Sequence, residues 1–257
     1  MTEENDFPRG TALVVGASGG VGGAISRALA QQGSDVVLCY RSSQAPVEAA
    51  AEAVRLAGRK ARVVKLDLQN AKSVKQAVNS AVAEFGQIHT VVYAAGPQLP
   101  LKWLSTIDPG EMAEFLNADT MAFFNLMHAS IPALRSSRGS VVAIHTCGLY
   151  RWPNKDGLSV VPKAAIEAMI KGFAREEGSK GVRVNGIALG VLDGGLFHKM
   201  TAAGDLDESY VEATRKMVPL GRLGHLEEVA HAAVFLASSR AAYITGHSIV
   251  VDGGFHL

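Results

Sequence analysis

Short apolar runs alternate with longer helical patterns along most of this chain. The runs are rich in β-branched residues, and continuous apolar strands that alternate with helices are typical of a parallel sheet buried on both faces. Right-handed crossovers then place helices on both sides of that sheet. The runs that we expect to form strands are 12–15, 35–39, 62–66, 90–93, 140–144, 183–187 and 248–251.

This alternation predicts an α/β fold, namely one Rossmann-type, doubly wound, parallel seven-stranded sheet with helices on both faces. A chain of 257 residues suits a single domain, 1–257, because it can bury about three-quarters of its unfolded surface around one core. The least regular stretch, 191–217, follows the sixth strand. We expect it to form a lid over the carboxyl edge of the sheet, where such sheets bind ligands.

The charge balance excludes several classes of partner. Twenty-five basic and 24 acidic residues leave a net charge of +1, which provides no electrostatic attraction for nucleic acid or an anionic membrane. The polar first residues lack a targeting pattern, and no apolar run reaches the length of a membrane span. We therefore expect a cytoplasmic protein.

Cysteine and histidine usage indicates neither disulfides nor a metal. Cys39 and Cys147 lie far apart in apolar, strand-like contexts, which predicts reduced thiols in the core. His225 and His231 are the closest patterned histidines, and their separation does not match a paired-histidine zinc helix. We predict no metal site.

A glycine-rich loop follows the first predicted strand and opens the first predicted helix. Gly16, Gly20 and Gly22 lie in this loop. Glycines there allow a tight turn and a close approach to a pyrophosphate, whose charge is met by amides at the helix amino terminus. The position of the loop between strand and helix therefore indicates a dinucleotide site.

Several further motifs resemble those of the short-chain dehydrogenase/reductase family over essentially the whole chain. The loop matches the family's Gly-x-x-x-Gly-x-Gly pattern, residues 93–96 are a variant of its Asn-Asn-Ala-Gly turn, and Leu189-Gly190 stands where Pro-Gly is usual. The carboxyl-terminal motifs are the most specific; they are Gly221-Arg222-Leu223, Glu227-Glu228-Val229-Ala230, Phe235-Leu236-Ala237-Ser238, Ile244-Thr245-Gly246 and Val251-Asp252-Gly253-Gly254.

The end of the second strand bears on the choice of cofactor. A carboxylate there would accept the ribose hydroxyls of NAD, whereas this chain has Arg41, Ser42 and Ser43. Arg41 can pair with a 2′-phosphate, and Ser42 or Ser43 can donate a hydroxyl, which favours NADPH/NADP+. The alternative for Arg41 is a solvated loop cation. Asp67 and Leu68 resemble the pair that holds the adenine ring, although Asp67 alternatively caps the next helix.

The resemblance thus implies a set of cofactor-binding residues along the carboxyl edge of the sheet. They are Gly16, Ser18, Gly20, Val21, Gly22, Arg41, Ser42, Asp67, Leu68, Ala94, Ala95, Gly96, Lys163, Gly190 and Leu192.

The catalytic positions depart from the family pattern. In the family, a tyrosine donates the proton, a lysine binds the nicotinamide ribose, a serine polarises the carbonyl and an asparagine holds a water relay. The corresponding residues here are Ser159, Lys163, Thr146 and Asp119, in that order. Only the lysine is unchanged, and the separation between Thr146 and Lys163 is the family's own.

The missing tyrosine leaves the proton donor open. A serine hydroxyl is far less acidic than a phenol, whose pKa is about 10, so Ser159 is expected to hold a water. Burial would favour a protonated Asp119, whereas Lys163 would favour the ionised form. Asp156 has the tyrosine spacing of some enoyl reductases, but capping the next helix is its expected role. Tyr150 either folds back over the site or packs as a loop aromatic.

The resemblance implies an NADPH-dependent reductase of a ketone or a β-ketoacyl thioester, similar to 3-oxoacyl-[acyl-carrier-protein] reductases. One alternative is an enoyl or dienoyl thioester C=C reductase, because the absence of the tyrosine resembles certain reductases of that type. The other alternative is a degenerate nucleotide-binding subunit. Arg175, extended by Arg135 and Arg138, either contacts an acyl carrier protein or forms a solvated face. The helix 226–237 and the last strand resemble the family's homotetramer edge, with an apolar face of Val229, Ala233 and Leu236.

Overall fold

A parallel sheet forms the centre of the molecule in a computed structural model, which describes residues 6–202 and 208–257. It has seven strands in the order β3-β2-β1-β4-β5-β6-β7, and every neighbouring pair is parallel. The predicted sheet is confirmed, with each strand at or close to its expected residues. The strands are β1 (Thr11–Val15), β2 (Asp35–Tyr40), β3 (Ala61–Lys65), β4 (Ile88–Tyr93), β5 (Ser140–Thr146), β6 (Arg183–Leu189) and β7 (Ser248–Val251).

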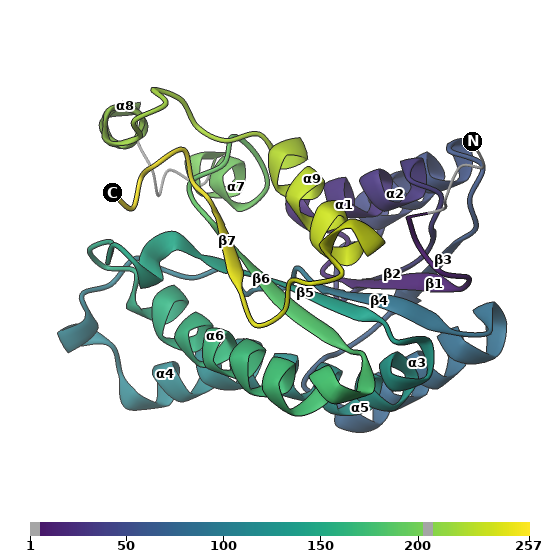
Figure 1. The fold of residues 1–257 in the computed structure, drawn as a ribbon. Coiled ribbons are helices and arrows are strands. Elements are labelled where there is room, and N and C mark those ends of the chain that lie inside the picture. Colours follow the sequence, from purple (N-terminus) through teal and green to yellow (C-terminus); the bar gives the residue numbers. More distant parts are fainter. Residues whose placement is uncertain (1–5, 203–207) are drawn as a thin grey trace.

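Helices cover both faces of this sheet (Figure 1). Helices α1 (Gly20–Gln31), α2 (Gln44–Leu56) and α9 (Leu226–Ala237) pack on one face, and α3 (Ala71–Phe85), α5 (Ala122–Ser137) and α6 (Gly157–Glu177) pack on the other. Alternate residues of a strand point to opposite faces, so Val36 and Leu38 join the first core and Val37 joins the second. The protein therefore has the doubly wound architecture that the sequence predicts.

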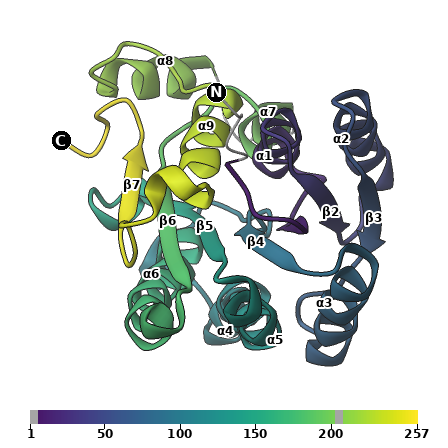
Figure 2. The same ribbon diagram turned by 45° about the vertical axis from the view of Figure 1, so that its right-hand side comes forward.

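The order of the strands reverses beside β1, since β2 follows it on one side and β4 on the other. Figure 2 shows this arrangement, with β3 and β7 at opposite edges. A doubly wound sheet binds its ligand in the crevice at the carboxyl ends of the strands where the order reverses. The glycine loop before α1 and the residues after β4 are therefore placed at the binding edge.

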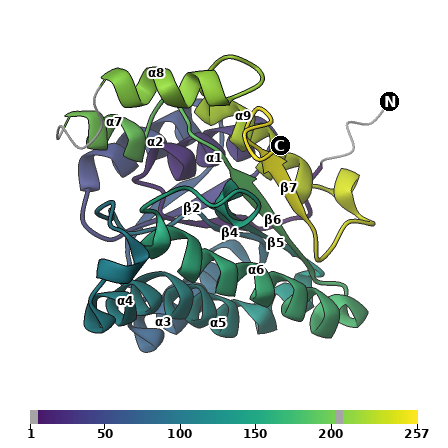
Figure 3. The same cartoon turned by 90° about the vertical axis from the view of Figure 1, so that its left-hand side faces the viewer.

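The stretch 191–217 is more regular than we expected. It contains α7 (Leu196–Ala202) and α8 (Glu208–Met217), which lie beyond the end of the sheet on the side of α1 and α9 (Figure 3). Residues 203–207 of the predicted lid lie outside the described residues. Gly195 lies against Gly20 at the start of α1, so the first part of this stretch adjoins the glycine loop.

The apolar face of α9 is not free for assembly, which corrects one expectation. Val229, Ala233 and Leu236 are almost completely buried within the chain, in the same core cluster as the apolar residues of α1. Their burial stabilises the fold of one chain, because α9 packs closely on α1. These three residues therefore provide no argument for a tetramer.

Candidate active site

A buried ion pair lies beside the carboxyl edge of the sheet. Lys163 Nζ is 3.0 Å from Asp119 Oδ1, and the two side chains are only 12% and 3% exposed. Lys163 Nζ also donates to the backbone oxygen of Ala95 at 3.2 Å. Both charged groups are therefore shielded from most of the solvent, and each is the other's ion-pair partner.

Asp119 is positioned by a local change in helix geometry. Helix α4 (Pro109–Phe115) continues as a π-helical segment, η2 (Leu116–Met121), and then as α5. A single π-helical segment within an α-helix widens the turn and is frequent at functional sites. Thr120 Oγ1 donates to the backbone oxygen of Pro162 at 3.1 Å, so two neighbouring residues of η2 bind two neighbouring residues of α6.

Tyr93, the first residue of the turn variant 93–96, completes the cluster. Its hydroxyl donates to Asp119 Oδ1 at 2.6 Å and lies 3.0 Å from the Asp119 backbone oxygen. Lys163 Nζ lies 5.1 Å from the centre of the Tyr93 ring. Desolvation and the neighbouring Asp119 raise the pKa of Tyr93 well above its usual value. A phenol at the end of a strand buried on both faces needs a polar partner, and this signal points to Tyr93 from the sequence.

The ion pair adjoins the glycine loop through the residues that follow β4. Ala95 accepts the bond from Lys163, and a side chain at Gly16 would place Cβ only 2.4 Å from the backbone oxygen of Ala94. Gly16 also has a φ of +78°, which other residues adopt at a cost. The loop, the turn after β4 and Lys163 therefore form one continuous site.

The glycine loop suits the pyrophosphate of a dinucleotide. A Cβ at Gly22 would lie 2.3 Å from the backbone oxygen of Gly16, so glycine is needed here for the loop to pack this closely against the start of α1. No side chain caps α1, and its first turn has no acidic residue. The amides and the dipole at this helix end are therefore available to a negatively charged group.

The predicted determinants of cofactor choice lie at the neighbouring strand ends. Arg41 and Ser42 follow β2 and are exposed, and Arg41 has no ion pair with the described residues. Asp67 does not cap α3, because Asn70 accepts from the backbone amides of Lys72 and Ser73 at that position. The capping alternative for Asp67 is therefore wrong. The adenine contacts of Asp67 and Leu68 stay predictions. The backbone oxygen of Leu68 accepts a hydrogen bond from the Asn125 side chain.

Among the described residues, the other predicted catalytic residues make no hydrogen bond to the cluster. Thr146 ends β5, and its hydroxyl accepts from the backbone amide of Gly148 at 3.0 Å. Ser159 lies one turn before Lys163 on α6 and is partly buried. The hydroxyl of Tyr150 instead lies 3.3 Å from Glu167 Oε1, and its ring packs near His256.

Two of the predicted cofactor-binding residues, Gly190 and Leu192, follow β6, and the Leu192 side chain is buried.

Asp156 differs from its expected role. It precedes α6 at the N-cap position, but its side chain makes no capping hydrogen bond. The described residues offer its carboxyl group no ion pair, and desolvation raises its pKa from 3.8 to about 7. The sequence prediction of a capping aspartate is therefore wrong. The cause is local, since Lys155 before it has a left-handed φ of +66° and Asp156 lacks the extended backbone of a typical cap.

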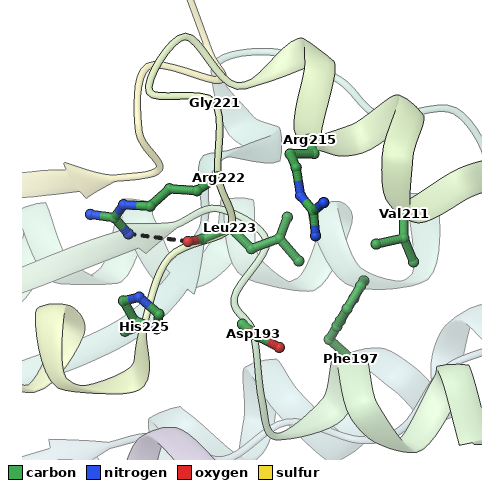
Figure 4. A pocket seen from close by; sticks show the side chains of 8 residues that line it. All are labelled: Asp193, Phe197, Val211, Arg215, Gly221, Arg222, Leu223 and His225. Carbon is green, nitrogen blue, oxygen red and sulfur yellow. Dashed lines mark hydrogen bonds between the residues drawn. The ribbon is translucent and has the colours of Figure 1, made fainter. Parts of the chain in front are cut away.

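A surface hollow of about 370 Å³ lies elsewhere, between α7, α8 and the turn before α9 (Figure 4). Phe197, Val211 and Arg215 face it, and Arg222 beside it donates to the backbone oxygen of Leu223. Arg222 is also paired with Glu228 at 2.6 Å. None of the residues lining this hollow belongs to the Asp119–Lys163 cluster, so it does not mark the reactive centre.

The described residues contain no group of metal-ligating side chains, and within that same part of the chain no helix is long and apolar enough to cross a membrane. Cys39 and Cys147 are free and buried, as the sequence predicts. Burial raises the pKa of both thiols to about 12. Neither thiol is therefore a thiolate nucleophile near neutral pH.

Comparison with known proteins identifies the family. A family model described as "Enoyl-(Acyl carrier protein) reductase" matches residues 16–256. The 3-oxoacyl-[acyl-carrier-protein] reductase FabG of Chlamydia trachomatis is 32% identical over 246 residues, which cover 95% of this chain and 96% of the relative. An uncharacterized oxidoreductase of Bacillus subtilis, YmfI, is 29% identical over 96% of this chain and 98% of its own length.

A solved structure shares the whole fold. A short-chain dehydrogenase/reductase from Serratia marcescens superimposes with a TM-score of 0.88 at 29% identity and covers 98% of this chain and 100% of its own. The chain belongs to the short-chain dehydrogenase/reductase family. It is therefore an oxidoreductase of a family that uses nicotinamide nucleotides.

The unpaired Asp156 generates a prediction about stability and pH. The folded protein keeps a proton on this carboxyl up to about pH 7, whereas the unfolded chain loses it near pH 3.8. The folded state thus binds more protons between these values, and this contribution to the free energy of unfolding falls as pH rises. Asp156→Asn should remove the effect, which is at most about 4 kcal/mol before solvent access reduces it.

Urea denaturation of wild type and Asp156→Asn at pH 4.5 and pH 8 measures the difference. The variant should gain stability relative to wild type at the higher pH. Asp108→Asn is a matched control, because Asp108 caps α4 by accepting from the amide of Gly110 and should show no such gain. Parallel pH dependence of wild type and Asp156→Asn would contradict the prediction.

Proposed function

We propose that this protein is an NADPH-dependent reductase of a ketone or a β-ketoacyl thioester that works without the family's tyrosine. The observation that carries the proposal is the buried Asp119–Lys163 pair, which adjoins the glycine loop through Ala95. The FabG relatives support the carbonyl substrate, since they are named 3-oxoacyl-[acyl-carrier-protein] reductases.

Lys163 is the central group in the proposed reaction. NADPH, when bound, supplies the hydride. The Lys163 ammonium binds the nicotinamide ribose and stabilises negative charge that develops on the substrate oxygen. Asp119 keeps a negative charge beside the ammonium and fixes its position. The hydroxyl groups of Thr146 and Ser159 hold the substrate oxygen or a water, through which a proton from Lys163 Nζ reaches it.

Asp156 is the second candidate for the proton source. Its carboxyl group retains a proton up to about pH 7, and Asp156 immediately precedes α6, three residues before Ser159 and seven before Lys163. We rank it ahead of Tyr150, because the phenol of Tyr150 is already engaged by Glu167.

Reduction of an enoyl or dienoyl thioester is the second candidate function. A conjugated acyl group yields an enolate, which the Lys163 ammonium and a water can stabilise without a phenol. The description of the matching family model, an enoyl-(acyl carrier protein) reductase, favours this chemistry. The third candidate, a non-catalytic subunit, is less consistent with a retained glycine loop and a buried lysine.

An acyl carrier protein has a smaller basic surface to contact than the sequence indicates. Arg175 is exposed, but Arg135 makes two hydrogen bonds to Glu177, at 2.6 and 2.7 Å. Arg138 packs against Gly181. We therefore propose Arg175 alone as a carrier contact.

Product identification separates the candidate functions. NADPH consumption is measured with a ketone, a β-ketoacyl thioester, an enoyl thioester and a dienoyl thioester, and each product is identified by mass spectrometry. Reduction of the β-ketoacyl thioester or the ketone at C=O supports the proposal. Reduction of C=C alone selects the second function, and no consumption with any acceptor selects the third.

Arg41 generates a prediction about the cofactor. Its guanidinium group is exposed and unpaired among the described residues, so it is available to a 2′-phosphate. Arg41→Ala should weaken NADPH binding by roughly 1 to 3 kcal/mol and leave NADH binding nearly unchanged. Fluorescence titration of both cofactors measures this, with Arg55→Ala, whose guanidinium pairs with Glu52, as the control. Equal losses for both cofactors would refute the assignment.

Asp119 generates a prediction about turnover. Asp119→Asn removes the charge that holds Lys163 and should lower kcat about 100-fold while NADPH still binds. Lys163→Ala should impair both NADPH binding and kcat, and Ser159→Ala should cost less than either. Steady-state kinetics on the substrate found above measure these effects. Wild-type turnover in Asp119→Asn would exclude the relay and leave Asp156 as the proton source.

Assembly remains a proposal, and we expect a homotetramer. Phe124 on α5 is 43% exposed and lies near Phe173 on α6, so these two helices expose apolar surface that a second copy would cover. Light scattering at micromolar concentration should give four times the chain mass of 27.0 kDa. Phe124→Glu should lower the mass, whereas a monomeric wild type would contradict the proposal.

A further inference from the structure

Tyr93 has a polar environment that its place in the sheet does not require. The residue ends β4, is completely buried, and packs edge-on against Phe123 with ring centres 5.2 Å apart. A phenylalanine would fill the same volume without a buried hydroxyl. The hydroxyl is instead satisfied by two oxygens of a single residue, Asp119.

The hydrogen bonds around Asp119 have a definite direction. The Lys163 ammonium has only protons to donate, so Asp119 Oδ1 accepts from Nζ at 3.0 Å. The Tyr93 hydroxyl donates to the same oxygen at 2.6 Å. An oxygen that accepts from both a lysine and a phenol has the environment of a carboxylate.

The ring of Tyr93 contributes to the same arrangement. Lys163 Nζ lies 5.1 Å from the ring centre, within the range of a cation–π contact. The ammonium is thus bounded by the Tyr93 ring, the Asp119 carboxylate and the Ala95 backbone oxygen. Tyr93 therefore touches both partners of the ion pair and, being fully buried, has no access to a substrate.

We propose that Tyr93 is a positioning residue, whose hydroxyl holds the Asp119 carboxylate against Lys163 and so fixes the ammonium at the reactive edge. This inference rests on the proposed reductase function. It adds the hydroxyl of a strand residue to the ion pair, whose two members come from η2 and α6. Loss of the hydroxyl leaves the carboxylate with one donor fewer and free to rotate away from Nζ.

Chemical labelling of ligand-free protein tests the positioning without turnover. Acetic anhydride acetylates lysine amines that reach the solvent, and Lys163 Nζ is held in a buried ion pair with Asp119. The acetylation rate of Lys163, read by mass spectrometry, should rise about fivefold or more in Tyr93→Phe, because the carboxylate that holds Nζ loses one of its hydrogen-bond donors. Lys171, which is 64% exposed and pairs with Glu167, is the internal reference in every digest.

A double-mutant cycle distinguishes positioning from general loosening. If Tyr93 acts through Asp119, Tyr93→Phe should not change the Lys163 rate further in an Asp119→Asn background. Thr120→Val is the matched control, because it removes another hydrogen bond between η2 and α6 and should leave Lys163 labelling unchanged. An unchanged rate in Tyr93→Phe, or an equal rise in both backgrounds, would overturn the proposal.

Steady-state kinetics provide the second readout. Tyr93→Phe should lower kcat about tenfold or more and leave the KM of the substrate within about twofold, because the residue acts on Lys163 and does not touch the substrate. A raised KM with unchanged kcat would contradict the proposal. If no acceptor is reduced by wild type, the proposed function falls, and the labelling cycle alone decides the role of Tyr93.

Discussion

The buried ion pair between Asp119 and Lys163 imposes the strictest constraint on this structure. Moving two charges out of water costs several kcal/mol for each ion, and their attraction offsets that cost only when further hydrogen bonds satisfy them. Here the Tyr93 hydroxyl and the Ala95 backbone oxygen supply those bonds. The pair therefore requires that β4, η2 and α6 meet at one point, and the π-helical segment is the local adjustment that brings Asp119 there.

The same constraint explains how the site remains compatible with the family's fold. The lysine keeps its place on α6 and reaches the turn after β4, which packs on the glycine loop at Gly16. What changes is the group beside the lysine. A carboxylate from η2 and a phenol from β4 surround the ammonium, while the position one turn earlier on α6 is a small serine.

The sequence predicts the sheet well because strand burial leaves a strong pattern. Each apolar run that was expected to form a strand does so, since a strand covered on both faces tolerates few polar residues. The ion pair was also foreseen, because Asp119 and Lys163 align with family positions. The role of Tyr93 was not predicted. A buried phenol in a strand indicates only that a polar partner is needed, whereas the contact between β4 and η2 that supplies Asp119 is encoded by no local pattern.

Two of the incorrect expectations have the same physical origin. Asp156 was expected to cap α6, but the left-handed backbone at Lys155 changes the entry into the helix. The apolar face of α9 was assigned to assembly, although it is buried against α1 in the same chain. In both cases the residue types were read correctly, and the tertiary arrangement decided which neighbour each side chain meets.

Restoring the missing phenol tests the central claim most directly, namely that the Asp119–Lys163 pair replaces the tyrosine. The decisive measurement is kcat of Ser159→Tyr on the substrate that wild type reduces. We expect a marked loss of kcat, because the ring would occupy the space in which we propose that Ser159 holds a water, beside a lysine that Asp119 already engages. A kcat at or above that of wild type would show that the site is a tyrosine site that has merely lost its donor, and would contradict the account.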